Sequence, residues 1–129
     1  MILDASAVIA ILRDEPDAPR FHAAIANAEH RRISAATHFE AAVVIDAQRD
    51  SIASRKLDDL MQRIRVEIVP FTAAQAKLAR DAYRDYGKGS GHPARLNFGD
   101  CFAYALAKEL GEPLLFKGDD FSKTDVEPA

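Results

Sequence analysis

The sequence predicts an α/β domain with a short parallel sheet and helices on both of its faces. Short apolar segments that suit strands alternate with longer segments whose apolar residues recur at helical spacing. Strands that alternate with helices are typical of parallel sheets, because a helix carries the chain back to the start of the next strand. The 129 residues fit one domain, 1–129, which can bury a core without disulfides or structural metals.

The elements follow from apolar periodicity and from end signals. Strands are predicted at residues 2–3, 32–35, 66–69 and 113–116. Helices are predicted at residues 5–12, 17–30, 37–49, 52–64, 72–86 and 97–110. Gly111 is expected to end the last helix, and the glycine-dense stretch 87–95 is expected to be a loop.

Composition excludes several classes of protein. With 17 Lys and Arg against 20 Asp and Glu, the net charge is -3, so nucleic-acid binding would need a local basic patch. The single Cys101 excludes an internal disulfide and suits a reducing compartment. No signal-peptide pattern and no apolar run of about 20 residues is present, so we expect a cytoplasmic protein.

Asp4 is the first candidate site residue. It follows the first predicted strand directly, and parallel α/β sheets bind ligands beyond the carboxyl ends of their strands. The alternative is a structural role, because Asp is also a favoured N-cap for the helix that follows.

Glu40 is the second candidate. In a helix over 37–49 it shares a face with Ala36, Val43 and Val44, so its carboxylate is expected to point toward the core side, where a buried acid needs a partner. The alternative is a capping box, in which Glu40 reaches back to the backbone of Thr37.

The remaining candidates lie near the C-terminus. Asp100 falls in the first turn of the most apolar helix, where Asn97 can act as N-cap and the helix dipole favours an acid. Asp119 and Asp120 follow the last predicted strand, in a Gly-Asp-Asp sequence that also suits an ordinary turn. We expect Asp119 to be the fourth acid, because it comes sooner after the strand and Gly118 lets the backbone turn.

Taken together, the four acids predict a metal site. Two follow strands and two begin helices that face the sheet, so their carboxylates are expected to meet in one crevice. Clustered carboxylates repel one another unless a divalent cation compensates them. An all-oxygen ligand set, without a Cys or His pair, favours Mg²⁺ or Mn²⁺ over Zn²⁺.

The order of these motifs resembles the PIN-domain ribonucleases of the VapC type. The likeness rests on Met1 to Ala7 (MILDASA), Glu40, Asn97 to Cys101 (NFGDC), Leu114 to Phe121 (LLFKGDDF) and the tail Thr124 to Val126. It spans essentially the whole chain, and the order and spacing of the motifs are more specific than any one of them.

The resemblance implies a three-layer α/β/α PIN-like fold and a divalent-metal-dependent endoribonuclease. The implied catalytic residues are Asp4, Glu40, Asp100 and Asp119. Asp4 and Asp100 are the main ligands of Mg²⁺, for which Mn²⁺ can substitute, and Ser6 matches the hydroxyl that orders the pocket. It further implies the toxin role in a type II toxin–antitoxin pair, a cognate VapB-type antitoxin, a homodimer, and an RNA substrate with tRNA and rRNA as candidates.

Two interpretations remain open beside this one. Lys88, His92 and Arg95 precede the Asp100 helix and could hold RNA phosphates, although a solvated loop explains them equally. The chain could also be a non-catalytic metal-binding regulatory module with the same fold, since acids can persist in a site that no longer turns over.

Overall fold

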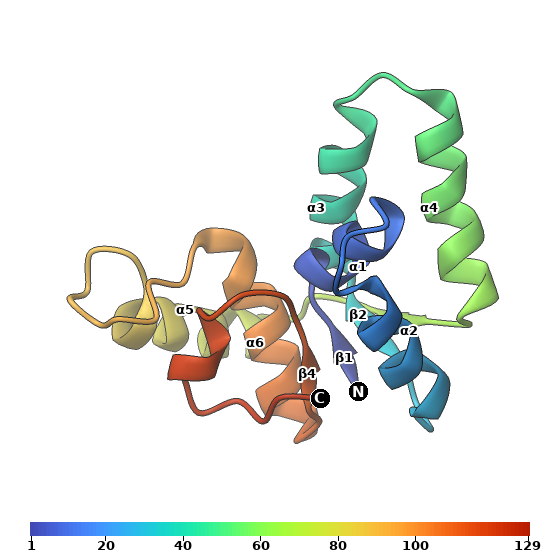
Figure 1. Cartoon of the computed structure of the whole chain (residues 1–129). Coiled ribbons are helices and arrows are strands. Elements are labelled where there is room, and N and C mark those ends of the chain that lie inside the picture. Colours follow the sequence, from blue (N-terminus) through green and yellow to red (C-terminus); the bar gives the residue numbers. More distant parts are fainter.

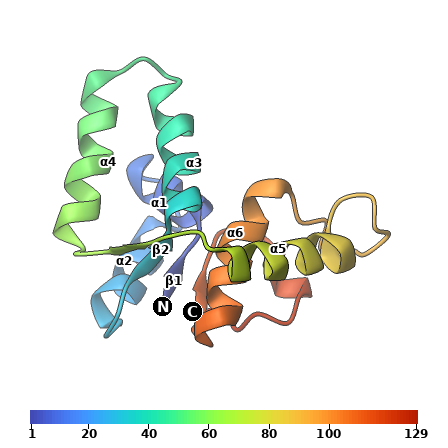
Figure 2. The same cartoon turned by 180° about the vertical axis from the view of Figure 1, so that it is seen from behind.

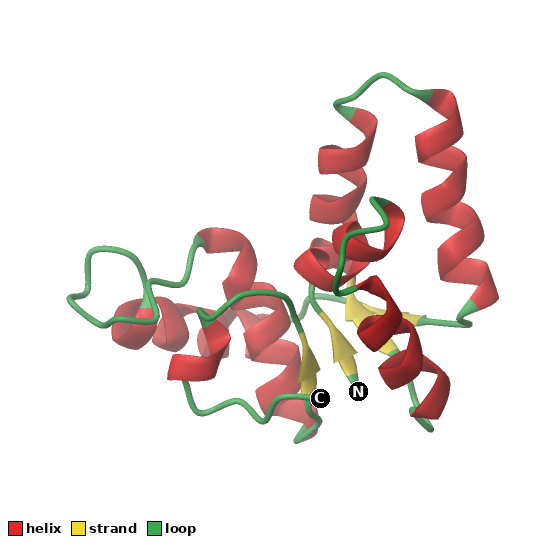
Figure 3. Cartoon of the chain, in the orientation of Figure 1, coloured by secondary structure: helices red, strands yellow, loops and turns green.

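A computed structural model describes all residues, 1–129, and confirms the predicted α/β/α architecture. The four strands are β1 (Ile2–Leu3), β2 (Arg32–Ser34), β3 (Glu67–Val69) and β4 (Leu114–Leu115). They form one sheet in the order β3-β2-β1-β4, and every neighbouring pair is parallel (Figure 3). All strands therefore end at the same edge of the sheet, and this places the residues that follow them side by side.

Helices cover both faces of the sheet. They are α1 (Ala5–Leu12), α2 (Ala18–Asn27), α3 (Ala35–Asp46), α4 (Ser51–Arg63), α5 (Ala73–Tyr86) and α6 (Phe98–Leu110), followed by a 3₁₀ turn at Phe121–Lys123. α5 and α6 lie on one side of the sheet and α1 to α4 on the other (Figures 1 and 2). None of these helices is long and apolar enough to cross a membrane.

The strands separate two hydrophobic cores. In β1, Ile2 belongs to the core under α5 and α6, whereas Leu3 belongs to the core under α1 to α4. Leu114 and Leu115 in β4 divide in the same way, because successive side chains of a strand point to opposite faces. In β1 and β4, two apolar residues are therefore enough to contact both layers.

The start of α3 differs from the prediction. Ser34, not Thr37, caps this helix, and its side chain accepts a hydrogen bond from the Ala36 amide. Thr37 is buried inside the helix, so the alternative capping box with Glu40 is wrong. Ser34 is the N-cap because β2 ends at Ser34 and α3 begins at the next residue, so no loop separates them in which the helix could start later.

The buried face of α3 is also not the one predicted. Its buried residues are Thr37, Ala41 and Ile45, while Val43 is half exposed. The earlier start of the helix and its packing against α1 and α4 select this face. α3 and α4 pack together as a helical hairpin that extends away from the sheet (Figure 1).

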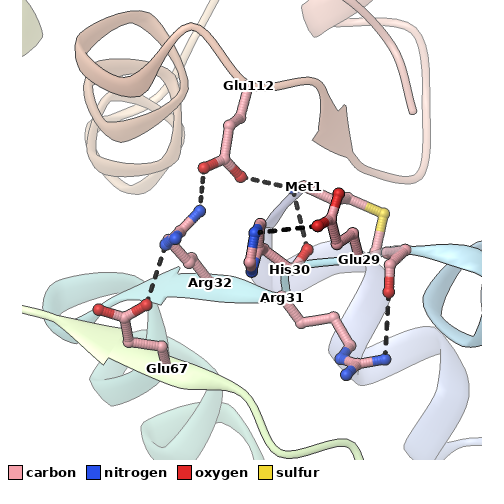
Figure 4. A network of polar contacts seen from close by, with 8 residues as sticks. Met1, Glu29, His30, Arg31, Arg32, Glu67 and Glu112 are labelled. Carbon is pink, nitrogen blue, oxygen red and sulfur yellow. Dashed lines mark hydrogen bonds and ion pairs between the residues drawn. The ribbon is translucent and has the colours of Figure 1, made fainter.

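The amino-terminal ends of the strands are held by an ion-pair network. The amine of Met1 lies 2.5 Å from Glu112, and Arg32 contacts both Glu112 and Glu67 (Figure 4). Because these groups come from β1, β2, β3 and the connection before β4, the network fastens the sheet at the edge opposite Asp4.

Candidate active site

Asp4 lies at the carboxyl end of β1 and is only 4% exposed. It is both a helix cap and a buried acid: its Oδ2 accepts hydrogen bonds from the Ser6 amide at 3.0 Å and from the Ser6 hydroxyl at 2.6 Å. Burial raises the pKa of Asp4, and the bonds from Ser6 oppose that rise. The capping alternative is thus confirmed, yet it leaves the second carboxylate oxygen, Oδ1, without a protein hydrogen bond.

Ser6 connects Asp4 to the end of β4. Its hydroxyl accepts a hydrogen bond of 2.9 Å from the backbone amide of Lys117, and the side chain of Lys117 pairs with Glu15 and lies 3.7 Å from Asp17. The Ser6 hydroxyl therefore links the Asp4 carboxylate to the backbone of Lys117, while its role in ordering a metal site stays a prediction. Lys117, which the sequence did not single out, ties the loop between α1 and α2 to the segment that carries Asp119 and Asp120.

Glu40 projects from α3 toward the start of α6. A Cβ atom placed on Gly99 would lie 1.9 Å from Oε2 of Glu40, so the carboxylate rests directly on the glycine backbone. Burial raises the pKa of Glu40 to about 7, and the charges of Asp4 and Asp100 contribute to the rise. Although its predicted helix face was wrong, Glu40 does lie beside the other acids.

Asp100 occupies the first turn of α6, where the predicted cap with Asn97 is confirmed. Oδ2 of Asp100 accepts from the Asn97 amide at 2.9 Å, and the Asn97 side chain accepts from the Asp100 amide at 2.9 Å. Burial raises the pKa of Asp100 to about 6, with Asp4 and Asp120 adding to the rise and Lys88 opposing it. Oδ1 of Asp100 makes no hydrogen bond within the protein.

Asp119 and Asp120 are both exposed and follow Gly118, which takes a φ of 97°. That positive φ explains the glycine, because other residues rarely adopt it. Of the two acids, Asp120 is the one whose charge raises the pKa of Asp100. Phe121 is buried, and the centroid of its ring lies 5.1 Å from that of Phe116. This contact anchors the turn. The choice of Asp119 as fourth acid stays a prediction, with Asp120 as its rival.

The acids share a negative field that no ion pair neutralises, and Lys88 offsets only part of it. Asp4, Glu40 and Asp100 form no ion pair with any Lys or Arg, and charge repulsion contributes to the raised pKa values of Glu40 and Asp100. Oxygen donors of this kind suit Mg²⁺ or Mn²⁺. As placed, no three acidic, His or Cys side chains converge closely enough to hold an ion. The oxygen donors and the negative charge of the cluster fit a divalent cation, but the side chains would have to move closer together to bind it.

The loop before α6 is fixed by its own contacts. Its two ends pair through Lys88 and Leu96, whose backbone amide and carbonyl are 2.9 Å apart. The His92 ring accepts a hydrogen bond from the Ala94 amide and stacks edge-on against Tyr86. His92 thus has a structural role, whereas Lys88 and Arg95 are exposed and form no ion pair.

The raised pKa values predict how metal-free stability depends on pH. Glu40 and Asp100 bind protons more tightly in the folded state than in the unfolded state, where their pKa values are about 4.5 and 3.8. Folding is therefore favoured at low pH, and stability falls as pH rises from about 4 through 7. We expect the metal-free melting temperature to be higher at pH 5.5 than at pH 8, by roughly 5 °C.

Differential scanning calorimetry in chelator, at several pH values, checks this expectation. Glu40→Gln should flatten the slope, and addition of Mn²⁺ should offset the loss at pH 8. A metal-free melting temperature that rises over this interval would contradict the repulsion between the acids.

Comparisons with known proteins agree with the geometry. The family model described as PIN domain matches residues 1–127. Ribonuclease VapC28 of Mycobacterium tuberculosis is 56% identical over 129 residues, covering 100% of this chain and 97% of that protein. Ribonuclease VapC of Mycolicibacterium smegmatis is 50% identical over 126 residues, covering 98% of this chain and 97% of that protein.

Solved structures share the fold at low sequence identity. The crystal structure of VapC20 from M. tuberculosis, a sarcin–ricin loop cleaving toxin, superimposes with a TM-score of 0.77 at 14% identity, covering 99% of this chain and 97% of that one. VapBC2 from Rickettsia felis, bound to a DNA fragment from its promoter, gives a TM-score of 0.75 at 14% identity, with 98% and 94% coverage.

Proposed function

Because this chain belongs to the PIN-domain family and, within it, to the VapC ribonucleases, we propose that it hydrolyses RNA phosphodiester bonds with a divalent cation, Mg²⁺ or Mn²⁺, at its acid cluster. One observation carries the proposal. Asp4, Glu40 and Asp100 come from three separate elements, yet each of the two acids with a large pKa shift responds to the charge of its neighbours. Burial is the larger cause of both shifts and repulsion adds to it, and acids that are both buried and close to one another suit a cation rather than a structural role.

The residues divide into two roles. Asp4 and Asp100 are the proposed ligands, in line with the family resemblance, and each keeps one carboxylate oxygen free of hydrogen bonds to the protein. When bound, the ion would lower the pKa of water and offset charge on the attacked phosphate. Glu40, with a pKa of about 7, is suited to accept the proton of the attacking water. Asp119 or Asp120 would complete the site.

Incubation of the pure protein with structured RNA, with and without Mg²⁺ or Mn²⁺, tests this function. We expect defined fragments that disappear with chelator. Metal binding without any cleavage of tRNA or rRNA would instead favour the non-catalytic regulatory module.

The fourth acid is resolved by comparing Asp119→Asn with Asp120→Asn. We expect only one of the two to lower Mn²⁺ affinity and cleavage, by about tenfold or more, because adjacent side chains of a turning segment diverge. Asp119 is favoured because it comes sooner after β4. Asp120 is favoured because its charge raises the pKa of Asp100. Both variants should keep the wild-type melting temperature, since both side chains are exposed. Full activity in both would limit the site to three acids.

Lys88 and Arg95 are proposed to hold RNA phosphates beside the acids. Lys88 lies close enough to Asp100 to oppose the rise of its pKa, so a phosphate bound there would lie at the site. Replacing both with Ala should weaken RNA binding and reduce the slope of log affinity against log salt by about 1.4, which is about 0.7 for each lost contact. Metal affinity should be little changed. An unaltered salt slope would reduce the segment to a connecting loop.

A second copy of the chain is the proposed partner at an apolar groove. The groove, about 580 Å³, lies between α3, α5 and α6 and is lined by Phe71, Tyr83, Phe98 and Phe102 among others. Phe98 is 77% exposed and Phe39, on α3, is 69% exposed. Exposed apolar surface of this kind marks an interface. Sedimentation analysis should show a homodimer, and Phe98→Glu should give a monomer; a monomeric wild type would refute the proposal.

We also assign the chain the toxin role in a VapBC pair that acts in the cytoplasm. Its partner would be a small antitoxin whose disordered tail folds onto the helices near Arg13, Phe21 and Leu57 to Ile64. Phe21 and Leu57 themselves lie in the core, so the tail would contact the exposed residues around them. The structural neighbours include a toxin–antitoxin complex from Klebsiella pneumoniae, with a TM-score of 0.70. Expression of this chain alone should stop growth, and co-expression of the neighbouring antitoxin should restore it. Normal growth without RNA cleavage would count against both.

A further inference from the structure

A basic pocket lies away from the acid cluster, between α2 and the C-terminal end of α4. It encloses about 470 Å³, and its charged or titratable lining residues are His22, Arg31, Arg63 and Arg65. No acid lines it, and none of the three arginines forms an ion pair. The chain as a whole has a net charge of -3, so three unpaired guanidinium groups make this pocket a locally positive surface on a negatively charged protein.

The side chain of Arg31 is fixed by hydrogen bonds that leave one of its donors without a partner. Its Nη1 donates to the carbonyls of Ile25 and Ala28 at 3.3 Å, which fixes the side chain against the end of α2. Its Nε is buried and has no hydrogen-bond partner. Figure 4 shows that Arg31 points away from the Arg32–Glu112 network, so its charge is not used there. Because this fixed guanidinium contacts carbonyls and no carboxylate, its charge remains available to an oxygen-rich anion in the pocket.

Arg65 completes the basic rim of the pocket. It follows α4 with a φ of 50°, a left-handed conformation for which helix ends usually use Gly or Asn. Arg49 and Arg95 share this conformation, so what sets Arg65 apart is its place on the rim of the pocket together with Arg31 and Arg63.

We propose that this basic pocket binds a phosphate of the RNA substrate away from the bond that is cut, an inference that rests on the proposed ribonuclease function. Guanidinium groups match phosphate oxygens in pairs. The floor of the pocket is aliphatic, formed by Ile25, Leu60 and Ile64 with Ala26. It can therefore take the sugar or base of a nucleotide whose phosphate contacts the arginines.

The position of the pocket suits a contact remote from cleavage. Arg31 precedes β2 and Arg65 lies just before β3, whereas Asp4 follows β1, so the pocket and the acids lie at opposite edges of the sheet. The strands have only two or three residues, which makes the sheet about 10 Å deep. With one phosphate about every 3.4 Å of helix along a strand, a short folded RNA can reach both edges.

The test measures RNA binding in chelator, so that no RNA is cut and metal plays no part. Total tRNA and purified rRNA are titrated with the wild type and with Arg63→Gln/Arg65→Gln. We expect a several-fold loss of affinity and a log–log salt slope shallower by about 1.4, the value for two lost contacts. Arg55→Gln/Lys56→Gln removes the same charge from exposed positions of α4 outside this pocket and should have less than half that effect.

A second variant separates binding from stability. Arg65→Gly removes the cation but suits the left-handed backbone, so its melting temperature should rise while RNA affinity falls. A merely structural arginine would give no loss of RNA affinity. With Mg²⁺ present, the double variant should raise KM for long RNA and leave kcat unchanged, so the catalytic proposal stands whatever the result here.

Three outcomes would overturn the inference. The first is equal RNA binding by the wild type and Arg63→Gln/Arg65→Gln. The second is loss of inorganic phosphate binding, measured by ³¹P NMR, without loss of RNA affinity, which would make the pocket a small-anion site. The third is loss of antitoxin affinity alone, which would assign the arginines to the antitoxin tail, whose proposed site at Leu57 to Ile64 shares Leu60, Arg63 and Ile64 with this pocket.

Discussion

Asp4→Asn and Asp100→Asn are each expected to lower metal-dependent RNA cleavage by at least about 100-fold while the fold stays intact. Each change removes a charged ligand, which is worth several kcal/mol of charge stabilisation in a metal-assisted reaction. Neither change removes the cap, because the amide oxygen of Asn can still accept from the Ser6 amide or from the Asn97 amide. Cleavage rate, Mn²⁺ affinity and melting temperature should be measured together.

The stability result separates this account from a purely structural role for the acids. Relief of repulsion should keep or raise the metal-free melting temperature of both variants. Asp58→Asn is a matched control, because Asp58 is exposed on α4 and makes no hydrogen bond or ion pair through its side chain. If either site variant cleaves RNA at the wild-type rate, Asp4 and Asp100 do not share a metal site.

Gly99→Ala is expected to reduce cleavage by about tenfold or more although alanine is the better helix former. The new methyl group would lie 1.9 Å from Oε2 of Glu40, so the carboxylate must move away from the other acids. Because Glu40 is flexible and Gly99 sits in the first turn of α6, the fold should tolerate the change, and helix propensity offsets part of its cost, by up to about 1 kcal/mol. Activity should therefore fall without a comparable fall in melting temperature.

A double-mutant cycle identifies Glu40 as the cause. In a Glu40→Ala background the methyl group meets no carboxylate, so Gly99→Ala should then have little further effect on the residual rate. If the two changes lower the cleavage rate independently, the effect of Gly99→Ala does not arise from contact with Glu40.

The sequence predicted the parts of the site that local signals determine. Asp4 follows a strand that is apolar on both faces. Asn97 and Asp100 form a capping box, and that motif depends on only four consecutive residues. The start of α3 was mispredicted because Ser34 and Thr37 are both good caps, and only the direct connection from β2 decides between them.

Other features depend on contacts between distant segments and could not be predicted. Gly99 matters because Glu40 of another helix lies on it, and the only local signal was a glycine where helix propensity disfavours one. The choice between Asp119 and Asp120 depends on a turn whose register one residue can shift. The basic pocket gathers arginines from the segment before β2 and from the end of α4 and the residues after it, which no sequence spacing relates.

Cleavage and metal binding measured on the same samples test the central claim most directly. Mn²⁺ is titrated into the wild type and into Asp100→Asn, binding is followed by electron paramagnetic resonance, and cleavage of structured RNA is followed in parallel. We expect cleavage by the wild type to rise with Mn²⁺ occupancy and to vanish in chelator, and Asp100→Asn to lose both together. RNA cleavage that persists in chelator, or that survives in Asp100→Asn after Mn²⁺ binding is lost, would contradict a metal-dependent ribonuclease built on these acids.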